Sequence, residues 1–274
     1  MHVIAHHIKI QDRLAFIQVV EPESPSGVDL LLLHTAGQSG AQWRRSLEPL
    51  SSLGYRLIVP DLPGHGHSEP CAVGPVQDIS TYAAWTSRLI DMLQRGTLTL
   101  VGCSIGGKIA QDVAIARGDR VGSLVSMCAP IGPGSVNLEV LWQELEDSAA
   151  AARMDRTHLG TRAVIGNRVS KERAELIARM HCREDPLVSI SDLIAWATHD
   201  AEREISAIAC PATFVAATDD LWVEANELRD AANTVSPSRF VLLEGYGHYP
   251  MEEMPNFAKE LHGWIADMEK EGRQ

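Results

Sequence analysis

Gly102-Cys103-Ser104-Ile105-Gly106 places a serine at the centre of a Gly-x-Ser-x-Gly sequence. The apolar run at 98–101 before it predicts a strand, and the periodic run at 108–117 after it predicts a helix. A serine on such a sharp strand-to-helix turn is held in a strained backbone conformation that exposes its hydroxyl above the sheet. The N–H groups at the start of the helix then favour an anion beside the serine. This arrangement predicts that Ser104 is a nucleophile.

A serine hydroxyl needs a histidine to accept its proton and a carboxylate to orient that histidine. Around such a turn the chain order is serine, then acid, then histidine. Asp219 and Asp220 directly follow a predicted strand at 212–217. His248 lies in a glycine-containing loop after a predicted strand at 239–243. We therefore expect His248 to be the general base and one of the two aspartates to orient it.

Four motifs of the chain resemble those of serine-nucleophile members of the α/β-hydrolase superfamily. They are Leu30-Leu-Leu-Leu-His34-Thr-Ala-Gly37, Asp61-Leu-Pro-Gly-His-Gly-His-Ser68, the turn at Ser104, and Gly245-Tyr-Gly-His248. The resemblance covers nearly the whole chain and implies an α/β fold with a doubly wound, mostly parallel sheet. Strands that alternate with helices along the chain agree with this fold. One departure is Thr35, because relatives commonly have His-Gly at this point of the first motif.

The resemblance also assigns roles to individual residues. Relatives often carry the acid in a Gly-x-x-Asp pattern, which Ala217-Thr-Asp-Asp220 matches with alanine in the first position. This favours Asp220 as the acid and leaves Asp219 to cap the following helix. The oxyanion hole is expected to consist of the backbone N–H groups of Ala36 and Ile105.

The alternation of strands and helices is interrupted between the α/β segments. Four stretches there have helical periodicity, and none of that region predicts a strand; the stretches are Leu138–Met154, Thr157–Gly166, Lys171–Cys182 and Ile190–Ala201. We therefore expect an α/β-hydrolase core of residues 1–130 and 210–274, with residues 131–209 inserted as a helical cap. A cap of this kind closes over the nucleophile and shapes the substrate pocket.

Four large side chains are candidates for the substrate pocket. Trp142 and Trp196 lie in the predicted cap, where packing inside the cap is the alternative role for each. Leu221 and Tyr249 are the chain neighbours of the predicted acid and base. Other conspicuous residues are expected to be structural: Cys103 as a small packed side chain, and His34, His65 and His67 as parts of turns that relatives share.

A serine, a histidine, an aspartate and two N–H donors predict acyl transfer through an acyl-enzyme. The expected substrate is a carboxylic ester or a lactone of a small molecule. One alternative is hydrolysis of a carbon–carbon bond in a ring-cleavage diketone, although such relatives usually have asparagine and tryptophan where this chain has Cys103 and Tyr249. Another alternative is a small-ligand sensor on the same fold, which the presence of all three triad residues disfavours.

The composition of the chain restricts its possible partners, cofactors and cellular setting. The chain has 274 residues, 45% of them hydrophobic, and a net charge of −12, which disfavours nucleic acids and anionic membranes as partners. Neither a signal peptide nor an apolar run of about 20 residues is evident. Five scattered cysteines indicate reduced thiols and a cytoplasmic protein. Metal-ligand spacings and phosphate-binding motifs are missing, so we expect no metal and no other cofactor. A homodimer stays open.

Overall fold

The computed structural model describes residues 2–146 and 153–271. Its sheet has the strand order β1-β2-β4-β3-β5-β6-β7-β8. β2 pairs antiparallel with β1 and β4, and the pairs from β4–β3 through β7–β8 are parallel. The strands are β1 His2–Ile10, β2 Arg13–Glu21, β3 Val28–Leu33, β4 Arg56–Pro60, β5 Thr97–Cys103, β6 Ser123–Met127, β7 Ala212–Ala217 and β8 Ser238–Leu243. This topology confirms the predicted fold class.

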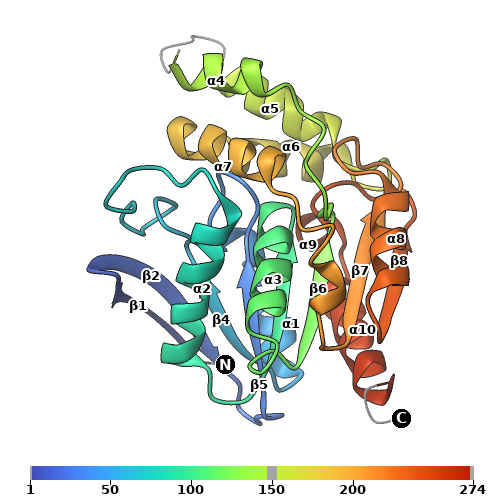
Figure 1. Cartoon of the computed structure of the whole chain (residues 1–274). Helices are drawn as coiled ribbons and strands as arrows, with labels where there is room; N and C mark the ends of the chain where they lie inside the picture. The colour runs from blue at the N-terminus through green and yellow to red at the C-terminus, as the bar shows by residue number, and fades with distance from the viewer. Residues whose placement is uncertain (1, 147–152, 272–274) are drawn as a thin grey trace.

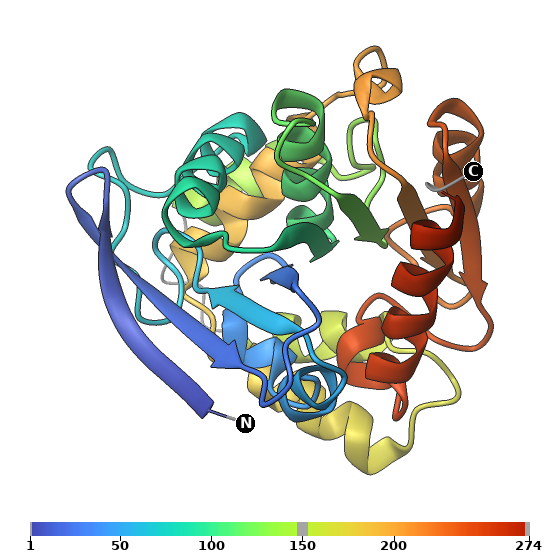
Figure 2. The same ribbon diagram turned by 90° about the horizontal axis from the view of Figure 1, so that it is seen from below.

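Helices cover both faces of the sheet, as Figures 1 and 2 show. α2, α3 and α8 pack on one face, and α1 and α10 pack on the other. The helices of this part are α1 Leu47–Ser52, α2 Ile79–Leu93, α3 Ile105–Ala116, α8 Ala225–Thr234, α9 Pro250–Glu253 and α10 Phe257–Glu271, with the 3-10 turn η1 Gly40–Trp43.

The leucine run in β3 shows why the sheet is buried on both sides. Leu31 and Leu33 belong to the hydrophobic cluster under α2 and α3, whereas Leu30 and Leu32 belong to the cluster under α1 and α10. Successive side chains of a strand point to opposite faces. A continuous apolar run is therefore what a parallel strand between two helix layers needs.

The segment that joins β6 to β7, which we call the insertion (residues 131–209), lies above one end of the sheet in Figure 1. Its helices are α4 Leu138–Glu146, α5 Arg153–Ala163, α6 Lys171–His181 and α7 Pro186–Thr198, followed by the 3-10 turn η2 Ile205–Ala207. Within the described part of the insertion there is no strand, in agreement with the sequence pattern.

Helix boundaries in the insertion differ from the predicted ones. The helix predicted at 138–154 runs into 147–152, which lie outside the described residues, and Met154 belongs to α5. The prediction that α7 begins at Ile190 is wrong by four residues. Asp185 caps this helix by accepting hydrogen bonds from the N–H groups of Leu187 and Val188, with Pro186 in its first turn.

Among residues 2–146 and 153–271, no helix combines the length and the apolarity that crossing a bilayer requires.

Candidate active site

Ser104 joins β5 to α3 in a backbone conformation that few residues other than glycine adopt. Its φ is 56° and its ψ is −123°. Two neighbouring glycines permit the sharp turn: a Cβ on Gly102 would lie 2.1 Å from the carbonyl oxygen of Gly106, and a Cβ on Gly106 would lie 2.6 Å from that of Leu33. Strain of this kind persists only where surrounding structure enforces it, and it concentrates at functional sites.

Asp220 and His248 form a buried pair beside this turn. The Asp220 Oδ2 atom lies 2.8 Å from His248 Nδ1, and the two side chains are 1% and 7% exposed. Asp220 Oδ1 accepts a hydrogen bond from the N–H of Trp222, which fixes the second carboxylate oxygen. A carboxylate can only accept, so the histidine carries its proton on Nδ1 and leaves Nε2 as a base.

Asp219 points elsewhere, and the expectation that it caps the next helix is wrong. Its Oδ2 atom accepts a hydrogen bond from the N–H of Asn167 in the insertion, and its Oδ1 atom accepts one from the Thr218 hydroxyl. The residue at the N-cap of α8 is Glu224, which makes no side-chain capping bond. Asp219 therefore ties the strand end to the insertion.

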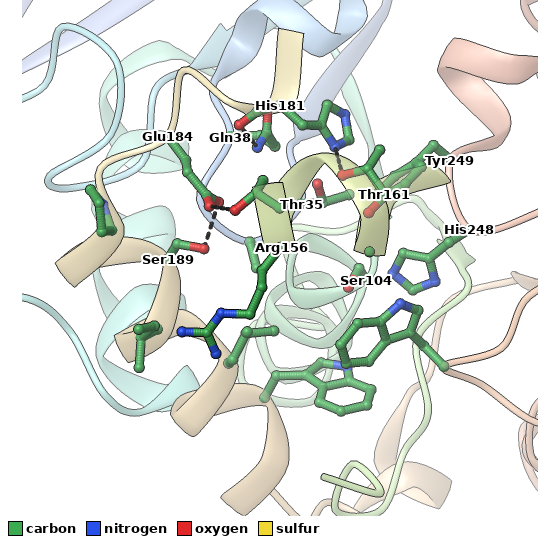
Figure 3. Close-up of a pocket in the computed structure, with 18 of the residues that line it drawn as sticks. Thr35, Gln38, Ser104, Arg156, Thr161, His181, Glu184, Ser189, His248 and Tyr249 are labelled. Carbon is green, nitrogen blue, oxygen red and sulfur yellow. Dashed lines mark hydrogen bonds between the residues drawn. The ribbon is translucent and has the colours of Figure 1, made fainter. Parts of the chain in front are cut away.

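Ser104 and His248 face one cavity of about 200 Å³ between the sheet and the insertion. Figure 3 shows Ser104 beside the imidazole, with Tyr249 next to it. Within the described residues, no hydrogen bond joins the Ser104 hydroxyl to His248. Catalytic hydrogen bonds of unliganded enzymes are often long and shorten only in the substrate complex.

The loop after β3 is held by side chains on both sides of Ala36. Before it, the N–H of Thr35 donates to Gln42 Oε1 (2.9 Å), and the Thr35 carbonyl lies 2.9 Å from His34 Nδ1. After it, the N–H of Gly37 donates to Asp192 Oδ2 of α7 (2.8 Å). Across the described part of the chain, the N–H groups of Ala36 and Ile105 make no hydrogen bond, and Ala36 lines the cavity.

Glu252 connects this loop to the insertion. Its Oε2 atom lies 2.6 Å from His181 Nε2 on α6 and accepts a hydrogen bond from Gln42 Nε2 (3.1 Å). Burial alone raises the pKa of the Glu252 carboxyl, but the His181 hydrogen bond and charge, together with Arg44, outweigh burial and lower this pKa. Sequence reasoning did not identify Glu252, because its partners lie 71 and 210 residues away.

Glu253 holds the loop that carries His248. Its Oε2 atom accepts hydrogen bonds from the N–H groups of Gly247 (2.7 Å) and Gly166 (3.0 Å), and Oε1 accepts one from Tyr249 (2.9 Å). The N–H of His248 itself donates to the carbonyl of Val164 in the insertion (2.8 Å). This carboxylate was also missed, since nothing in the sequence around it signals a role.

The candidate substrate residues separate into two groups. Trp196 and Tyr249 line the cavity. Trp142 and Leu221 do not line it, and their side chains are 44% and 75% exposed. Trp222, next to Leu221, lines the cavity instead and meets Trp196 edge to face at 6.1 Å between ring centroids. Leu221 therefore does not face the cavity, and the side chain that does is that of its chain neighbour Trp222.

The other side of the cavity is polar, as Figure 3 shows. Glu184 accepts hydrogen bonds from the Thr157 hydroxyl (2.5 Å) and the Ser189 hydroxyl (2.6 Å), and burial raises the pKa of its carboxyl. Arg153 and Arg156 of α5 line this side as well. The sequence did not point to these residues, which only the docking of the insertion brings to the cavity.

One group of side chains has the composition of a metal site. The ligand atoms of Cys128, Asp220 and His248 lie within 4.8 Å of one another. However, Asp220 and His248 are already hydrogen-bonded to each other, and the Cys128 pKa is raised well above its usual value, chiefly by a hydrogen bond with Cys103 and by burial. A neutral thiol is a poor metal ligand. Cys103 is buried, and its thiol donates to the carbonyl of His248 (3.2 Å).

The turn histidines make structural contacts. His34 Nε2 accepts a hydrogen bond from the N–H of Leu62 (3.0 Å), and His65 Nε2 lies 2.7 Å from Asp192 Oδ2. Burial first, and the charge of His65 second, lower the pKa of His34 to about 3, so this imidazole is neutral. His67 is exposed and lies 3.4 Å from Asp61.

Comparison with known proteins agrees with the fold. Residues 30–260 match the sequence pattern of a family described as the alpha/beta hydrolase family. The chain is 30% identical over 129 residues to pimeloyl-[acyl-carrier protein] methyl ester esterase of Vibrio atlanticus (strain LGP32), with 47% of each chain covered. It is also 30% identical over 125 residues to 2-hydroxy-6-oxononadienedioate/2-hydroxy-6-oxononatrienedioate hydrolase 1 of Dechloromonas aromatica (strain RCB), covering 44% of this chain and 43% of that one.

These matches span about half the length of the curated relatives. Among solved structures, the enol-lactonase from Burkholderia xenovorans LB400 superposes with a TM-score of 0.82 and 19% identity, over 95% of this chain and 100% of that chain. At this sequence identity the structural similarity shows the fold alone.

Proposed function

Because the chain belongs to the alpha/beta hydrolase family, we propose that it is a serine hydrolase that cleaves a carboxylic ester or a lactone of a small molecule. The observation that carries the proposal is the strained Ser104, which lines the same cavity as His248, the hydrogen-bond partner of Asp220. A nucleophile, a base within the same cavity and a carboxylate that orients the base are the parts that acyl transfer requires.

In the proposed mechanism, His248 Nε2 takes the Ser104 proton as the serine oxygen attacks the carbonyl carbon. The resulting imidazolium is stabilised by the Asp220 carboxylate. His248 then protonates the leaving alcohol, which departs and leaves an acyl-enzyme. Water attacks the acyl carbon with the same base and regenerates Ser104. These steps use only the side chains of this protein and water.

The N–H groups of Ala36 and Ile105 are proposed to bind the oxyanion. Both are left without hydrogen-bond partners among the described residues, while the neighbouring Thr35 and Gly37 N–H groups are taken. Donors that are already oriented before the reaction stabilise the charge that develops in the transition state. Removal of one such donor typically costs a factor of about 10² to 10³ in kcat.

Residues 131–209 are proposed to act as a cap that defines the pocket. Trp196 of α7 supplies part of the apolar wall, and α5 supplies Arg153, Arg156 and Thr157 on the polar side. A cavity of about 200 Å³ is smaller than the roughly 300–1,000 Å³ typical of pockets that bind drug-sized ligands. We therefore propose a small substrate, with Trp196, Trp222 and Tyr249 packed around the scissile bond.

Hydrolysis of a carbon–carbon bond in a ring-cleavage diketone is the second candidate. The similarity to the Dechloromonas hydrolase supports it. The ester or lactone is preferred because the Vibrio relative is a methyl ester esterase and because Cys103 and Tyr249 depart from the residues usual in carbon–carbon hydrolases. The five free cysteines fit a reducing, cytoplasmic setting, which we also propose.

The proposal is tested with p-nitrophenyl esters of increasing acyl length, comparing the wild type with Ser104→Ala. We expect turnover by the wild type, loss of turnover in the variant and an unchanged melting temperature. A fluorophosphonate probe should add one adduct to the wild type and none to the variant, as read by intact mass. Turnover by Ser104→Ala would refute the assignment of the nucleophile. An adduct without turnover of esters, lactones or diketones would favour a sensor.

A further inference from the structure

Asp192 is a fully buried carboxylate that the proposed mechanism does not use. It lies in α7, within the insertion, and it is 0% exposed. Its Oδ2 atom accepts hydrogen bonds from the N–H of Gly37 (2.8 Å) and from His65 Nε2 (2.7 Å), and Oδ1 accepts one from the Tyr82 hydroxyl (2.6 Å). The three donors come from the loop after β3, the loop after β4 and α2, so one side chain of the insertion joins three segments of the core.

The contacts of His65 fit an ion pair with this carboxylate. Its Nδ1 atom lies 3.1 Å from the carbonyl oxygen of Pro63, and its Nε2 atom lies 2.7 Å from Asp192. The Pro63 carbonyl and an ionised Asp192 are both acceptors, and only an imidazolium donates from both nitrogens. Burial alone lowers the pKa of His65, but the charge and hydrogen bond of Asp192 outweigh burial and raise it. A buried ion pair with charge-assisted hydrogen bonds results.

The Gly37 contact places Asp192 next to the proposed oxyanion hole. Ala36 lies between two anchored peptide groups. Gln42, from the core, holds the N–H of Thr35, and Asp192, from the insertion, holds the N–H of Gly37. The hydrogen bond from the Gly37 N–H to Asp192 is short and charge-assisted, so it resists rotation of the Ala36–Gly37 peptide. A donor displaced by about 1 Å can cost a factor of 10² in rate.

We propose that Asp192 is a positioning residue for acyl transfer: by holding the Gly37 N–H, it makes the alignment of the Ala36 oxyanion donor depend on the seating of the insertion. This inference rests on the proposed function. Asp192 does not touch the substrate in this scheme, because Gly37, His65 and Tyr82 occupy its oxygens. Its removal is therefore expected to weaken binding of the transition state while leaving binding of the ground-state ester unchanged.

The test compares Asp192→Asn with the control Tyr82→Phe. The control removes one hydrogen bond to the same carboxylate but keeps the Gly37 and His65 contacts. With p-nitrophenyl acetate we expect Asp192→Asn to lower kcat about ten-fold, with KM within two-fold of the wild type. Tyr82→Phe should keep kcat within two-fold.

A second readout separates positioning from general loosening of the fold. A trifluoromethyl ketone adds the serine oxygen to its carbonyl carbon and places an oxyanion in the hole. Its inhibition constant should rise by the same factor by which kcat falls in Asp192→Asn, as expected of a transition-state analogue. If the single variant does not fold, Asp192→Asn combined with His65→Gln removes both charges together and should show the same losses.

The outcomes are distinct. A folded Asp192→Asn protein with wild-type kcat and inhibition constant overturns the inference while the proposed function stands. Equal losses in Tyr82→Phe also overturn it, because the cluster would then act through stability alone. If the wild type neither turns over an ester nor reacts with the fluorophosphonate probe, the proposed function fails and the inference falls with it.

Discussion

Asp220 Oδ2 lies 2.8 Å from Nδ1 of His248, while the adjacent carboxylate of Asp219 points to the backbone of Asn167. Two consecutive aspartates thus face different partners. Asp220 turns inward because its Oδ1 atom is held by the N–H of Trp222. Asp219 is left to bind the insertion. The geometry therefore supports Asp220 as the acid of the proposed triad.

Substitution of each aspartate by asparagine should separate the two roles. Asp220→Asn should lower kcat by a factor of about 10⁴, because the amide favours the wrong histidine tautomer. Asp219→Asn, the matched control, should stay within about three-fold, since its amide oxygen still accepts one hydrogen bond. Steady-state ester hydrolysis measures both. The reverse order of the two losses would move the acid to Asp219.

Glu253→Gln should impair catalysis without touching the triad. The glutamine has one acceptor oxygen where the glutamate offers two, so an N–H next to His248 loses its partner. We expect a loss of about 2 kcal/mol in the free energy of unfolding and a fall of about ten-fold in kcat. Urea unfolding and ester kinetics test this. Glu260→Gln in α10 is the control, and equal effects in the two variants would contradict the prediction.

The environment of Lys108 predicts an unusual dependence of the free energy of unfolding on pH. This buried side chain of α3 donates to the carbonyls of Gly132 (2.6 Å) and His199 (3.1 Å), one near each end of the insertion. Burial lowers its pKa from 10.5 to about 8. Between these two pH values the unfolded chain binds more protons than the folded one, so the contribution of this lysine makes the protein more stable as pH rises.

Lys108→Met isolates this contribution. Between pH 7 and pH 10, the free energy of unfolding of the wild type should rise relative to that of Lys108→Met by about 2 kcal/mol. Urea unfolding of both proteins across this range provides the measurement. If the two free energies of unfolding differed by a constant amount across this range, the pKa of Lys108 in the folded protein would be its ordinary value.

Trp222→Ala should widen the proposed pocket. The indole lines the cavity against Trp196, and its removal leaves room for a longer acyl chain. We expect the ratio of kcat/KM for the octanoate to that for the acetate p-nitrophenyl ester to increase about ten-fold, a change that a few methylene groups account for. Trp142→Ala, at an exposed tryptophan outside the cavity, should leave the ratio unchanged. If the ratio stayed unchanged in Trp222→Ala, the acyl chain would not lie against Trp222.

Local signals were enough for much of the fold. The turn at Ser104 is recognisable because strand, glycines and helix are contiguous in the sequence, and the structure shows the strained φ that such a turn requires. The β1–β2 hairpin turns at the polar residues Gln11 and Asp12 between two strands, and both have the positive φ values of a tight hairpin turn. In both places neighbouring residues carry all the information.

Side-chain directions in the insertion were not predictable. Trp142 and Trp196 both lie on helices of the insertion, yet one is exposed and the other lines the cavity. A helical pattern shows which residues share a face, but it does not show what that face packs against. The docking of the insertion on the core decides this, and it also brings Arg156 and Glu184 to the cavity.

The sequence by itself determined the α/β sheet, the helical nature of the insertion and the order of the predicted nucleophile, acid and base, because each depends on short-range pattern or on covalent order. Only the tertiary structure decided which aspartate faces His248. It alone revealed the buried carboxylates of Asp192 and Glu253, which hold the loops of the proposed site. Asp192 contacts Gly37 across 155 residues of chain. Such contacts follow from the packing of distant segments, where buried N–H groups must find acceptors that no local pattern specifies.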